Sequence, residues 1–382
     1  METRGASLEI TALATDLFRL TRFPRGQSAP PSWAVLPLAP MSPPPVPGPV
    51  VAETPIRLST REATWTLHPT SGEWSLHDAH GLELFRASPP GPAAPSRSPL
   101  NHLTLALHPR EQLFGLGETT GPLNKRGLIK EFWNIDVLGH APAIHPGLRN
   151  LYVSIPFALS LRDGRAAGLF WDCPARQTWD LGATHTDQWT LSADSPGLDL
   201  YLFTGPSPAR VVERFTELTG RIPLPPRWAL GYQQCRYSYT SRTELERVAA
   251  EFRRRQLPCD VLYCDIHHLD SYRVFTFGKT YPKPGQMIAQ LRRRGFKVVT
   301  IVDPGVKDDP RFGTLVRGRR LQAFVRDPQK RRDALGEVWP GRSRFPDFLH
   351  QRVRDWWGDE QRALVKLGVA GVWNDMNEPA NF

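Results

Sequence analysis

Three aspartates in the second half of the chain, Asp265, Asp303 and Asp375, each come at the end of a predicted strand. The carboxyl ends of parallel strands meet at one edge of a sheet or barrel, so we expect these side chains to lie close together. Carboxylates in such a position accept hydrogen bonds from hydroxyl groups. With tryptophans nearby and no pattern of metal ligands, the three aspartates favour sugar chemistry.

The strongest local signal is the stretch Trp373–Pro379, in which a strand end is followed by two acids on a short loop closed by a proline. Retaining glycoside hydrolysis needs two carboxyl groups about 5–5.5 Å apart on opposite sides of the glycosidic bond. Asp375 is the candidate nucleophile. Glu378 is too near it in sequence to reach the other side of the sugar, so a further acid must protonate the leaving oxygen. Two roles stay open for Glu378: orienting Asp375 by a hydrogen bond, or capping the loop.

Trp228, Trp339 and Trp373 could stack on the faces of pyranose rings. Each tryptophan taken alone is more often a core residue, so the loop with Asp375 carries more of the argument. The four cysteines form no C-x-x-C pair, which argues against structural zinc. We therefore expect a site with no metal and no cofactor.

The elements that must position these residues begin after residue 222, where strand-like and helix-like runs alternate. Trp228–Tyr232 is predicted as the first strand, and Ser241–Glu244 has the pattern of a capping box that opens a helix. The predicted strands ending at Asp265, Asp303 and Asp375 follow. A TIM barrel takes roughly 250 residues and eight strands, whereas this region has 160 residues and four. We expect the first half of a (β/α)8 TIM barrel, cut off after its fourth strand.

The residues before 223 alternate short apolar runs with glycine, proline and aspartate, as in Thr64–Leu67, Leu103–Leu107 and Gly168–Trp171. That pattern is typical of an all-β sandwich. The predicted organisation is therefore a β-sandwich domain over residues 1–222, followed by a partial barrel domain over residues 223–382.

Composition excludes some classes of function. The formal net charge is +10 and the isoelectric point is near 9.7, which raises nucleic-acid binding as an alternative. However, two of the basic clusters, Arg253–Arg255 and Arg292–Arg294, close predicted helices, where cations complement the helix dipole. No apolar run is long enough for a membrane helix and no secretory signal follows Met1. We expect no nucleic-acid partner, no membrane association and a cytoplasmic location.

Several stretches together resemble the N-terminal half of an α-glucosidase of glycoside hydrolase family 31. They occur in the order in which that family has them and extend from about Glu111 to the last residue. The matching stretches are Gln112–Glu118, Trp133–Asp136, Pro226–Tyr239, Leu257–His267, Phe275–Phe277, Ile301–Val306, Val338–Gly341, Phe345–Phe348 and Gly371–Pro379.

The resemblance implies a mutarotase-like β-sandwich packed on a (β/α)8 barrel that releases glucose, with retention, from the non-reducing ends of α-linked glucosides. Asp375 matches the family's nucleophile, and Asp136 matches an acid on a sandwich loop over the barrel mouth. The form Asp265–His267 and the run Tyr272–Thr276 look more like α-glucosidases than α-xylosidases. The residues that match the subsite for the non-reducing sugar are Asp265, Ile266, Asp303, Trp339, Trp373 and Met376.

The resemblance also implies that one catalytic group, the general acid/base, is missing from these residues. In the family, the general acid/base aspartate comes from a later strand, so the isolated chain is expected to be inactive towards an α-linked oligosaccharide or glucoside. One alternative is a non-catalytic carbohydrate-binding fragment, or a fragment completed by a separately encoded C-terminal half. Another is an α-xylosidase or transglucosidase of the same family.

Overall fold

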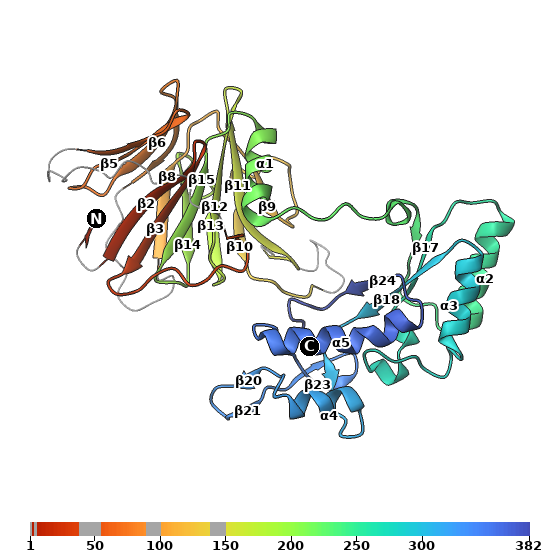
Figure 1. Cartoon of the computed structure of the whole chain (residues 1–382). Coiled ribbons are helices and arrows are strands. Elements are labelled where there is room, and N and C mark those ends of the chain that lie inside the picture. The colour runs from red at the N-terminus through yellow and green to blue at the C-terminus, as the bar shows by residue number, and fades with distance from the viewer. Residues whose placement is uncertain (1, 4–5, 38–54, 89–100, 138–149) are drawn as a thin grey trace. The chain divides into compact units, whose positions relative to one another are not determined.

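The computed structural model describes residues 2–3, 6–37, 55–88, 101–137 and 150–382. The chain divides into two compact units, Met1–Ile222 and Pro223–Phe382 (Figure 1), each of which is described by itself. No helix within the described residues is both long enough and apolar enough to cross a membrane.

The N-terminal unit consists of two antiparallel sheets. The order in the seven-stranded sheet is β1 (Glu2–Thr3), β2 (Ala6–Ala14), β3 (Leu17–Pro24), β15 (Leu198–Phe203), β12 (Arg165–Trp171), β11 (Ser154–Arg162) and β9 (Gln112–Gly117). The order in the eight-stranded sheet is β10 (Ile129–Phe132), β13 (Gln177–Asp180), β14 (Gln188–Ala193), β8 (Asn101–Ala106), β7 (Glu83–Ala87), β6 (Trp74–Asp78), β5 (Ala63–Leu67) and β4 (Ile56–Ser59).

The core of this unit lies between the two sheets, and the alternation in the sequence creates it. Every second residue of β5, β8 and β14 is buried, which is the period of a strand with one covered face. Trp65, Trp179 and Trp189 are completely buried there, together with leucines from both sheets. The predicted β-sandwich is confirmed.

Helix α1 (Pro208–Thr219) covers the outer face of the seven-stranded sheet. Its Val211 and Leu218 pack against Phe157 and Phe203 in a second apolar cluster. Because β12 and β15 are covered on both faces, they are apolar almost throughout and buried along nearly their whole length. At Gly168 of β12 a Cβ atom would lie 2.6 Å from a methyl carbon of Val211, so the close approach of α1 requires glycine.

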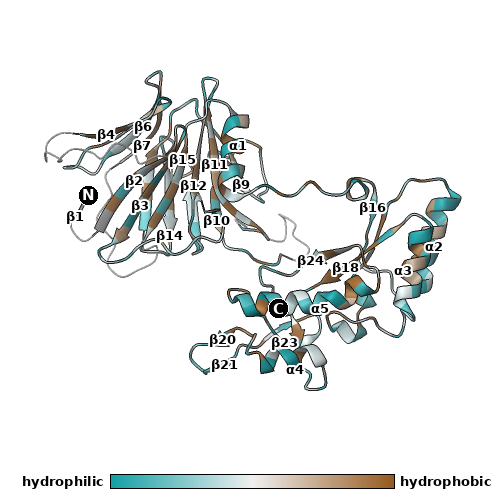
Figure 2. Cartoon of the chain, viewed as in Figure 1, coloured by the Kyte–Doolittle hydropathy of each residue, from teal (hydrophilic) through white to brown (hydrophobic). Residues whose placement is uncertain are grey.

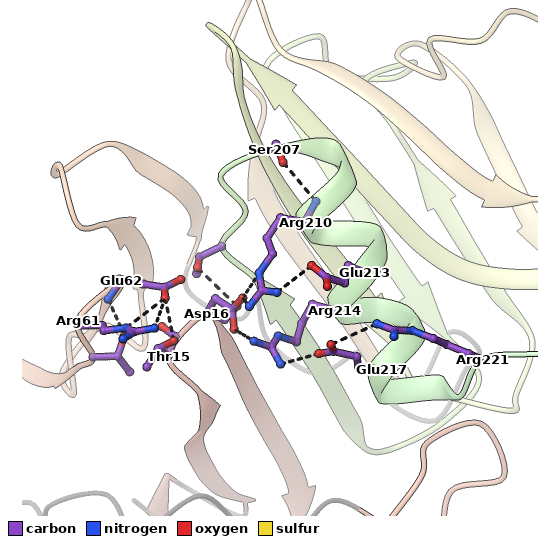
Figure 3. Close-up of polar contacts among 12 residues, drawn as sticks. Thr15, Asp16, Arg61, Glu62, Ser207, Arg210, Glu213, Arg214, Glu217 and Arg221 are labelled. Atoms are coloured by element: carbon purple, nitrogen blue, oxygen red, sulfur yellow. Dashed lines mark hydrogen bonds and ion pairs between the residues drawn. The ribbon is translucent and has the colours of Figure 1, made fainter.

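An ion-pair network on Asp16 ties α1 to the turn between β2 and β3 (Figure 3). The Asp16 carboxylate is almost fully buried, and Arg210 and Arg214 from successive turns of α1 contact it at 2.9 and 2.8 Å. Glu213 and Glu217 pair with the same two arginines on the solvent side. The turn at Asp16 and the helix are 194 residues apart in the sequence, so this contact fixes a long-range packing.

The C-terminal unit is built on a parallel sheet with the order β16 (Gln233–Gln234), β17 (Val261–Cys264), β18 (Lys297–Val302) and β24 (Gly371–Asn374). The connections carry α2 (Arg242–Arg254), α3 (Pro284–Arg293), α4 (Gly313–Arg320) and α5 (Gln351–Lys366). Short 3-10 helices are η1 (Arg227–Leu230), η2 (Ile266–His268) and η3 (Asp270–Tyr272). Smaller antiparallel pieces are β19 (Val306–Lys307) with β23 (Gly341–Arg344) and β22 (Gly336–Val338), and the hairpin of β20 (Arg326–Asp327) and β21 (Arg332–Asp333).

Strands β17, β18 and β24 and helix α2 form where the sequence predicts them. In β18 all residues after Lys297 are buried, as expected for a parallel strand covered on both faces. The strand is correspondingly hydrophobic (Figure 2). Ser241 caps α2, and its side chain accepts a hydrogen bond from the Glu244 N–H group. The four strands form an open sheet, as expected of part of a TIM barrel, so the predicted fold class is confirmed.

The first predicted strand is wrong. Residues 227–230 form the 3-10 helix η1, and the strand begins only at Gln233. Pro226 precedes the helix and its carbonyl oxygen accepts a hydrogen bond from Ala229 N–H, which starts a turn where the apolar run predicted extended backbone. Trp228 contacts the start of β24 near Gly371, at the edge of the sheet opposite to the strand ends.

Replacing Asp16 tests the contact between α1 and the sheet. Asp16→Ala leaves Arg210 and Arg214 without their buried acceptor, so we expect the free energy of unfolding of the N-terminal unit to fall by about 2–3 kcal/mol. Urea titration followed by tryptophan fluorescence measures it. The matched control is Glu213→Ala, which removes an exposed partner of the same network and should cost much less than Asp16→Ala. Equal losses in the two variants would contradict a special role for Asp16.

Candidate active site

The three predicted aspartates lie at one edge of the parallel sheet. Val302 pairs with Asn374 in the ladder between β18 and β24, so the next residues, Asp303 and Asp375, follow at the same level on strands about 4.8 Å apart. The Asp375 N–H group donates to the Val302 carbonyl oxygen at 3.3 Å, which continues the ladder to the strand end. Asp265 directly follows β17, the neighbour of β18 on the other side.

Asp303 is the most buried of these acids, with 4% of its surface exposed. Burial, followed by the negative charges of Asp375, Asp265 and Glu378, raises the pKa of its carboxyl group to about 7. Its Oδ1 atom is buried without a hydrogen-bond partner among the described residues. A buried oxygen atom that has no hydrogen-bond donor is suited to accept a hydrogen bond from a ligand hydroxyl group.

Asp265 is also buried, but backbone donors surround its carboxyl group. Its Oδ1 atom accepts a hydrogen bond from the Ile266 N–H group at 2.7 Å, and the Ser238 backbone also donates to it. Burial raises the pKa of Asp265 and the two backbone donors oppose that rise. Asp265 is therefore held in one orientation before any ligand is present.

Asp375 is half-buried, in contrast to the other two aspartates. The chain turns sharply after it, because Met376 has a φ of +60° and the Asn377 side chain donates to the Asp375 carbonyl oxygen at 2.7 Å. The Ala380 N–H group donates to the Met376 carbonyl oxygen and completes the turn. This geometry exposes the Asp375 carboxylate at the strand end while its backbone stays fixed.

Two apolar clusters contain residues that lie one or two positions from the three aspartates in the sequence. One cluster contains Ile266, Leu269 and Ile301 with Tyr272, Trp339 and Trp373, and an adjacent one contains Val338, Met376 and Ala380 with Trp339 and Phe345. Trp339 belongs to both clusters and joins them. The structure thus brings together Ile266, Trp339, Trp373 and Met376, for which the family resemblance implies a shared subsite.

Of the other residues predicted to contact sugar, Trp228 does not join this group, and Asp136 belongs to the N-terminal unit. Asp136 lies half-buried on the segment after β10 in the N-terminal unit, where the Ile135 N–H group donates to the Leu151 carbonyl oxygen. Trp228 lies at the other edge of the parallel sheet. Glu378 is near enough for its charge to raise the pKa of Asp303, and its orienting role stays a prediction.

Sequence reasoning missed a group of aromatic side chains at the rim of the site. Tyr237 and Tyr272 each contact the His267 ring, with ring centroids 5.3 and 5.7 Å apart, and Tyr237 also contacts Trp339 at 6.2 Å. Tyr237 is 65% exposed, which is high for a tyrosine. Their sequence signals are their positions just beyond the strand ends and within stretches that carry the family resemblance, Pro226–Tyr239, Leu257–His267 and Tyr272–Thr276.

His268, next to the site, is buried and neutral. Burial lowers its pKa to about 4, and its Nδ1 atom bonds to the Asp265 carbonyl oxygen at 2.8 Å. Phe277 contacts its ring, and the Gly278 N–H group donates to its carbonyl oxygen at 2.7 Å. His268 therefore fixes the backbone of Asp265 and the base of the loop that carries Tyr272. No group of three or more His, Cys, Asp or Glu side chains is placed to hold a metal ion in the part of the chain that is described.

Two family models match the chain. Residues 222–382 match the model of the glycosyl hydrolases family 31 TIM-barrel domain, and residues 7–180 match the model of the glycosyl hydrolase 31 N-terminal galactose mutarotase-like domain. The chain belongs to glycoside hydrolase family 31. The sandwich is accordingly the family's mutarotase-like domain, and the parallel sheet is part of its barrel.

The names of relatives in this family describe enzymes that act on α-glucosides or α-glucans. The chain is 40% identical over 332 residues to α-glucosidase 2 of Bacillus thermoamyloliquefaciens, covering 86% of this chain and 41% of that protein. It is 31% identical over 274 residues to an α-glucosidase of Saccharolobus solfataricus, covering 72% and 38%. A Flavobacterium johnsoniae family 31 dextranase complexed with isomaltotriose superposes with a TM-score of 0.88 at 26% identity, covering 98% of this chain and 46% of that one. The chain thus spans less than half the length of each of these three proteins.

The raised pKa of Asp303 predicts a pH-dependent stability. Between its ordinary value near 3.8 and about 7, native Asp303 stays protonated while the unfolded group ionises, so its contribution to stability is lost as the pH rises through that window. Asp303→Asn should therefore stabilise the C-terminal unit by a few kcal/mol at pH 8 and by little at pH 4.

Urea titrations of wild type and Asp303→Asn at several pH values measure this difference. His268 acts in the opposite direction, because its lowered pKa costs stability as the pH falls from about 6.5 to 4. His268 is present in both proteins, so its effect cancels in the difference between them. A difference that does not change between pH 4 and 8 would refute the burial of Asp303 as a neutral acid.

Proposed function

We propose that this chain supplies the nucleophile side of the active site of a retaining α-glucosidase that releases glucose from the non-reducing ends of α-glucosides. The observation that carries the proposal is the pairing of strand ends that places Asp375 beside buried Asp303 within an apolar wall. The naming of the aligned relatives as α-glucosidases supports the substrate class.

In this proposal each carboxylate has its own role. Half-buried Asp375 attacks the anomeric carbon and forms a covalent glucosyl intermediate, which water then cleaves. Asp265 and Asp303 accept hydrogen bonds from sugar hydroxyls, and Asp303 does so in place of the partner its Oδ1 atom lacks. Trp339, Trp373, Ile266 and Met376 exclude water from the sugar ring. Glu378 orients Asp375.

A retaining mechanism also needs a carboxylic acid to protonate the leaving oxygen. We propose that this acid comes from the C-terminal half that the relatives have beyond the matched region, on the same chain or as a separate one. The 382 residues alone should then bind sugar weakly and turn over no ordinary substrate. The cytoplasmic location predicted from the sequence stays a proposal.

α-Xylosidase activity is the alternative within the family. A family 31 α-xylosidase from a soil metagenome superposes with a TM-score of 0.80, but at 22% identity it supports the fold alone. The relatives at 30% identity or more favour glucosides, and the dextranase complex with isomaltotriose favours α-linked glucose chains among them.

A chimera tests the proposed nucleophile. Residues 1–382 are joined to the C-terminal half of the Bacillus α-glucosidase, and hydrolysis of 4-nitrophenyl α-glucoside is measured for the chimera, its Asp375→Asn variant and the 382-residue chain alone. We expect turnover by the chimera only, and a loss of about 10⁴-fold or more in kcat for Asp375→Asn, because the attacking group is gone.

Three controls accompany this experiment. Peptide mass spectrometry after treatment with a fluorinated glucosyl fluoride should find the label on Asp375. Glu378→Gln should lower kcat by much less than Asp375→Asn, because a neighbouring donor or acceptor orients rather than reacts. The parallel assay on the aryl xyloside separates the two specificities. Robust turnover by the Asp375→Asn chimera would overturn the proposal.

A further inference from the structure

His267 lies at the rim of the site and is held by a residue from another strand end. The Ser238 hydroxyl forms a short hydrogen bond with the Nδ1 atom of the His267 imidazole. It also accepts a hydrogen bond from the backbone N–H group of His267 at 3.3 Å. Ser238 follows β16, whereas His267 follows β17, so this pair links two neighbouring strand ends. One nitrogen of the imidazole thus already forms a hydrogen bond within the protein.

The backbone of Ser238 is strained in a way that serves this contact. Its φ is +64°, in the left-handed region that residues other than glycine rarely adopt, and its side chain is buried. The same residue donates its N–H group to the Asp265 carboxylate. Strain of this kind persists only where surrounding contacts determine the conformation, and such positions gather at functional sites. Ser238 therefore orients Asp265 and His267 together.

The second imidazole nitrogen, Nε2, is at the far end of the ring from the backbone. No hydrogen bond to it is found among the described residues, and His267 is only half-buried. The ring is flanked by Tyr237 and Tyr272, whose planes are inclined to it at 90° and 70°. A polar nitrogen framed by two aromatic rings is a usual arrangement for binding a sugar, which offers both hydroxyls and apolar ring faces.

We propose that His267 binds the leaving-group sugar, through a hydrogen bond from its Nε2 atom to a hydroxyl, and that Ser238 is the positioning residue for it. The burial of the surrounding residues places this contact outside the subsite for the first glucose. Asp303 and Ile266 are buried, His267 is half-buried and Tyr237 is largely exposed, so the aromatic rim is the outer part of the site. This inference rests on the proposed α-glucosidase function and assigns the second sugar within it.

Two conservative substitutions separate binding by Nε2 from a structural role. Asparagine places its amide near the Nδ1 position and can keep the bond to Ser238, whereas glutamine reaches the Nε2 position and gives up that bond. In the chimera, His267→Asn should lower kcat/KM for maltose by about 10-fold, mainly through KM, the size expected for one lost hydrogen bond. Its kcat/KM for 4-nitrophenyl α-glucoside, whose leaving group has no sugar hydroxyls, should change by less than about 2-fold.

His267→Gln should retain more activity on maltose than His267→Asn does. Ser238→Gly removes the hydroxyl at a backbone conformation that glycine adopts without strain, and should shift the maltose-to-aryl ratio in the same direction as His267→Asn. Melting temperatures of the variants check that they are folded, and Ser238→Gly serves as the second route if a His267 variant is not.

The outcomes for the inference and for the proposed function are distinct. Asp375-dependent hydrolysis with an unchanged maltose-to-aryl ratio in His267→Asn would overturn the role of His267 alone. A greater loss in His267→Gln than in His267→Asn would do the same, since it would show that the bond to Ser238 matters and Nε2 does not. A chimera without hydrolysis, or with hydrolysis that survives Asp375→Asn, would overturn the proposed function and the inference with it.

Discussion

The register of three parallel strands is the constraint on which the candidate site depends. Cys264 pairs with Thr300, and Val302 pairs with Asn374, so β17, β18 and β24 end within about two residues of one another. Acids placed directly after these strands must therefore meet. A slip of one residue in either ladder would turn the strand's side chains to the other face and separate the carboxylates. The apolar core beneath the sheet, where β18 is buried along nearly its whole length, fixes the register.

Bringing carboxylates together in a buried place costs stability, and the structure deals with each of them differently. Asp265 is stabilised by backbone donors from Ile266 and Ser238. Asp375 stays half-exposed, where water screens its charge. Asp303 has neither backbone donors among the described residues nor much exposure to water, and its raised pKa reflects the cost of ionising it there. An arrangement that disfavours its own charged form is expected where the missing hydrogen bonds are to be made by a ligand.

The sequence predicted the parts of this site that follow from periodicity and from the position of strand ends. The buried runs of β17 and β18 and the cap at Ser241 are local patterns, and the three aspartates follow from them. The prediction of a strand at Trp228–Tyr232 failed because a turn begun by Pro226 overrides an apolar run. The role of Ser238 could not be seen at all, since its bond to His267 joins residues that are 29 positions apart.

The loops beyond the strand ends show why such contacts escape a sequence pattern. Ser238, Ser271, Tyr272 and Met376 all have positive φ, yet none is a glycine or an asparagine, the residues that usually mark this conformation. Contacts from elsewhere hold them in place: Lys307 donates to the Ser271 carbonyl oxygen, and the Ala380 N–H group donates to that of Met376. Each strained residue is within one position of, or is itself, a side chain that lines the site. The rest of the fold thus holds these residues in strained conformations before a ligand binds. Ligand binding therefore does not need to order these loops.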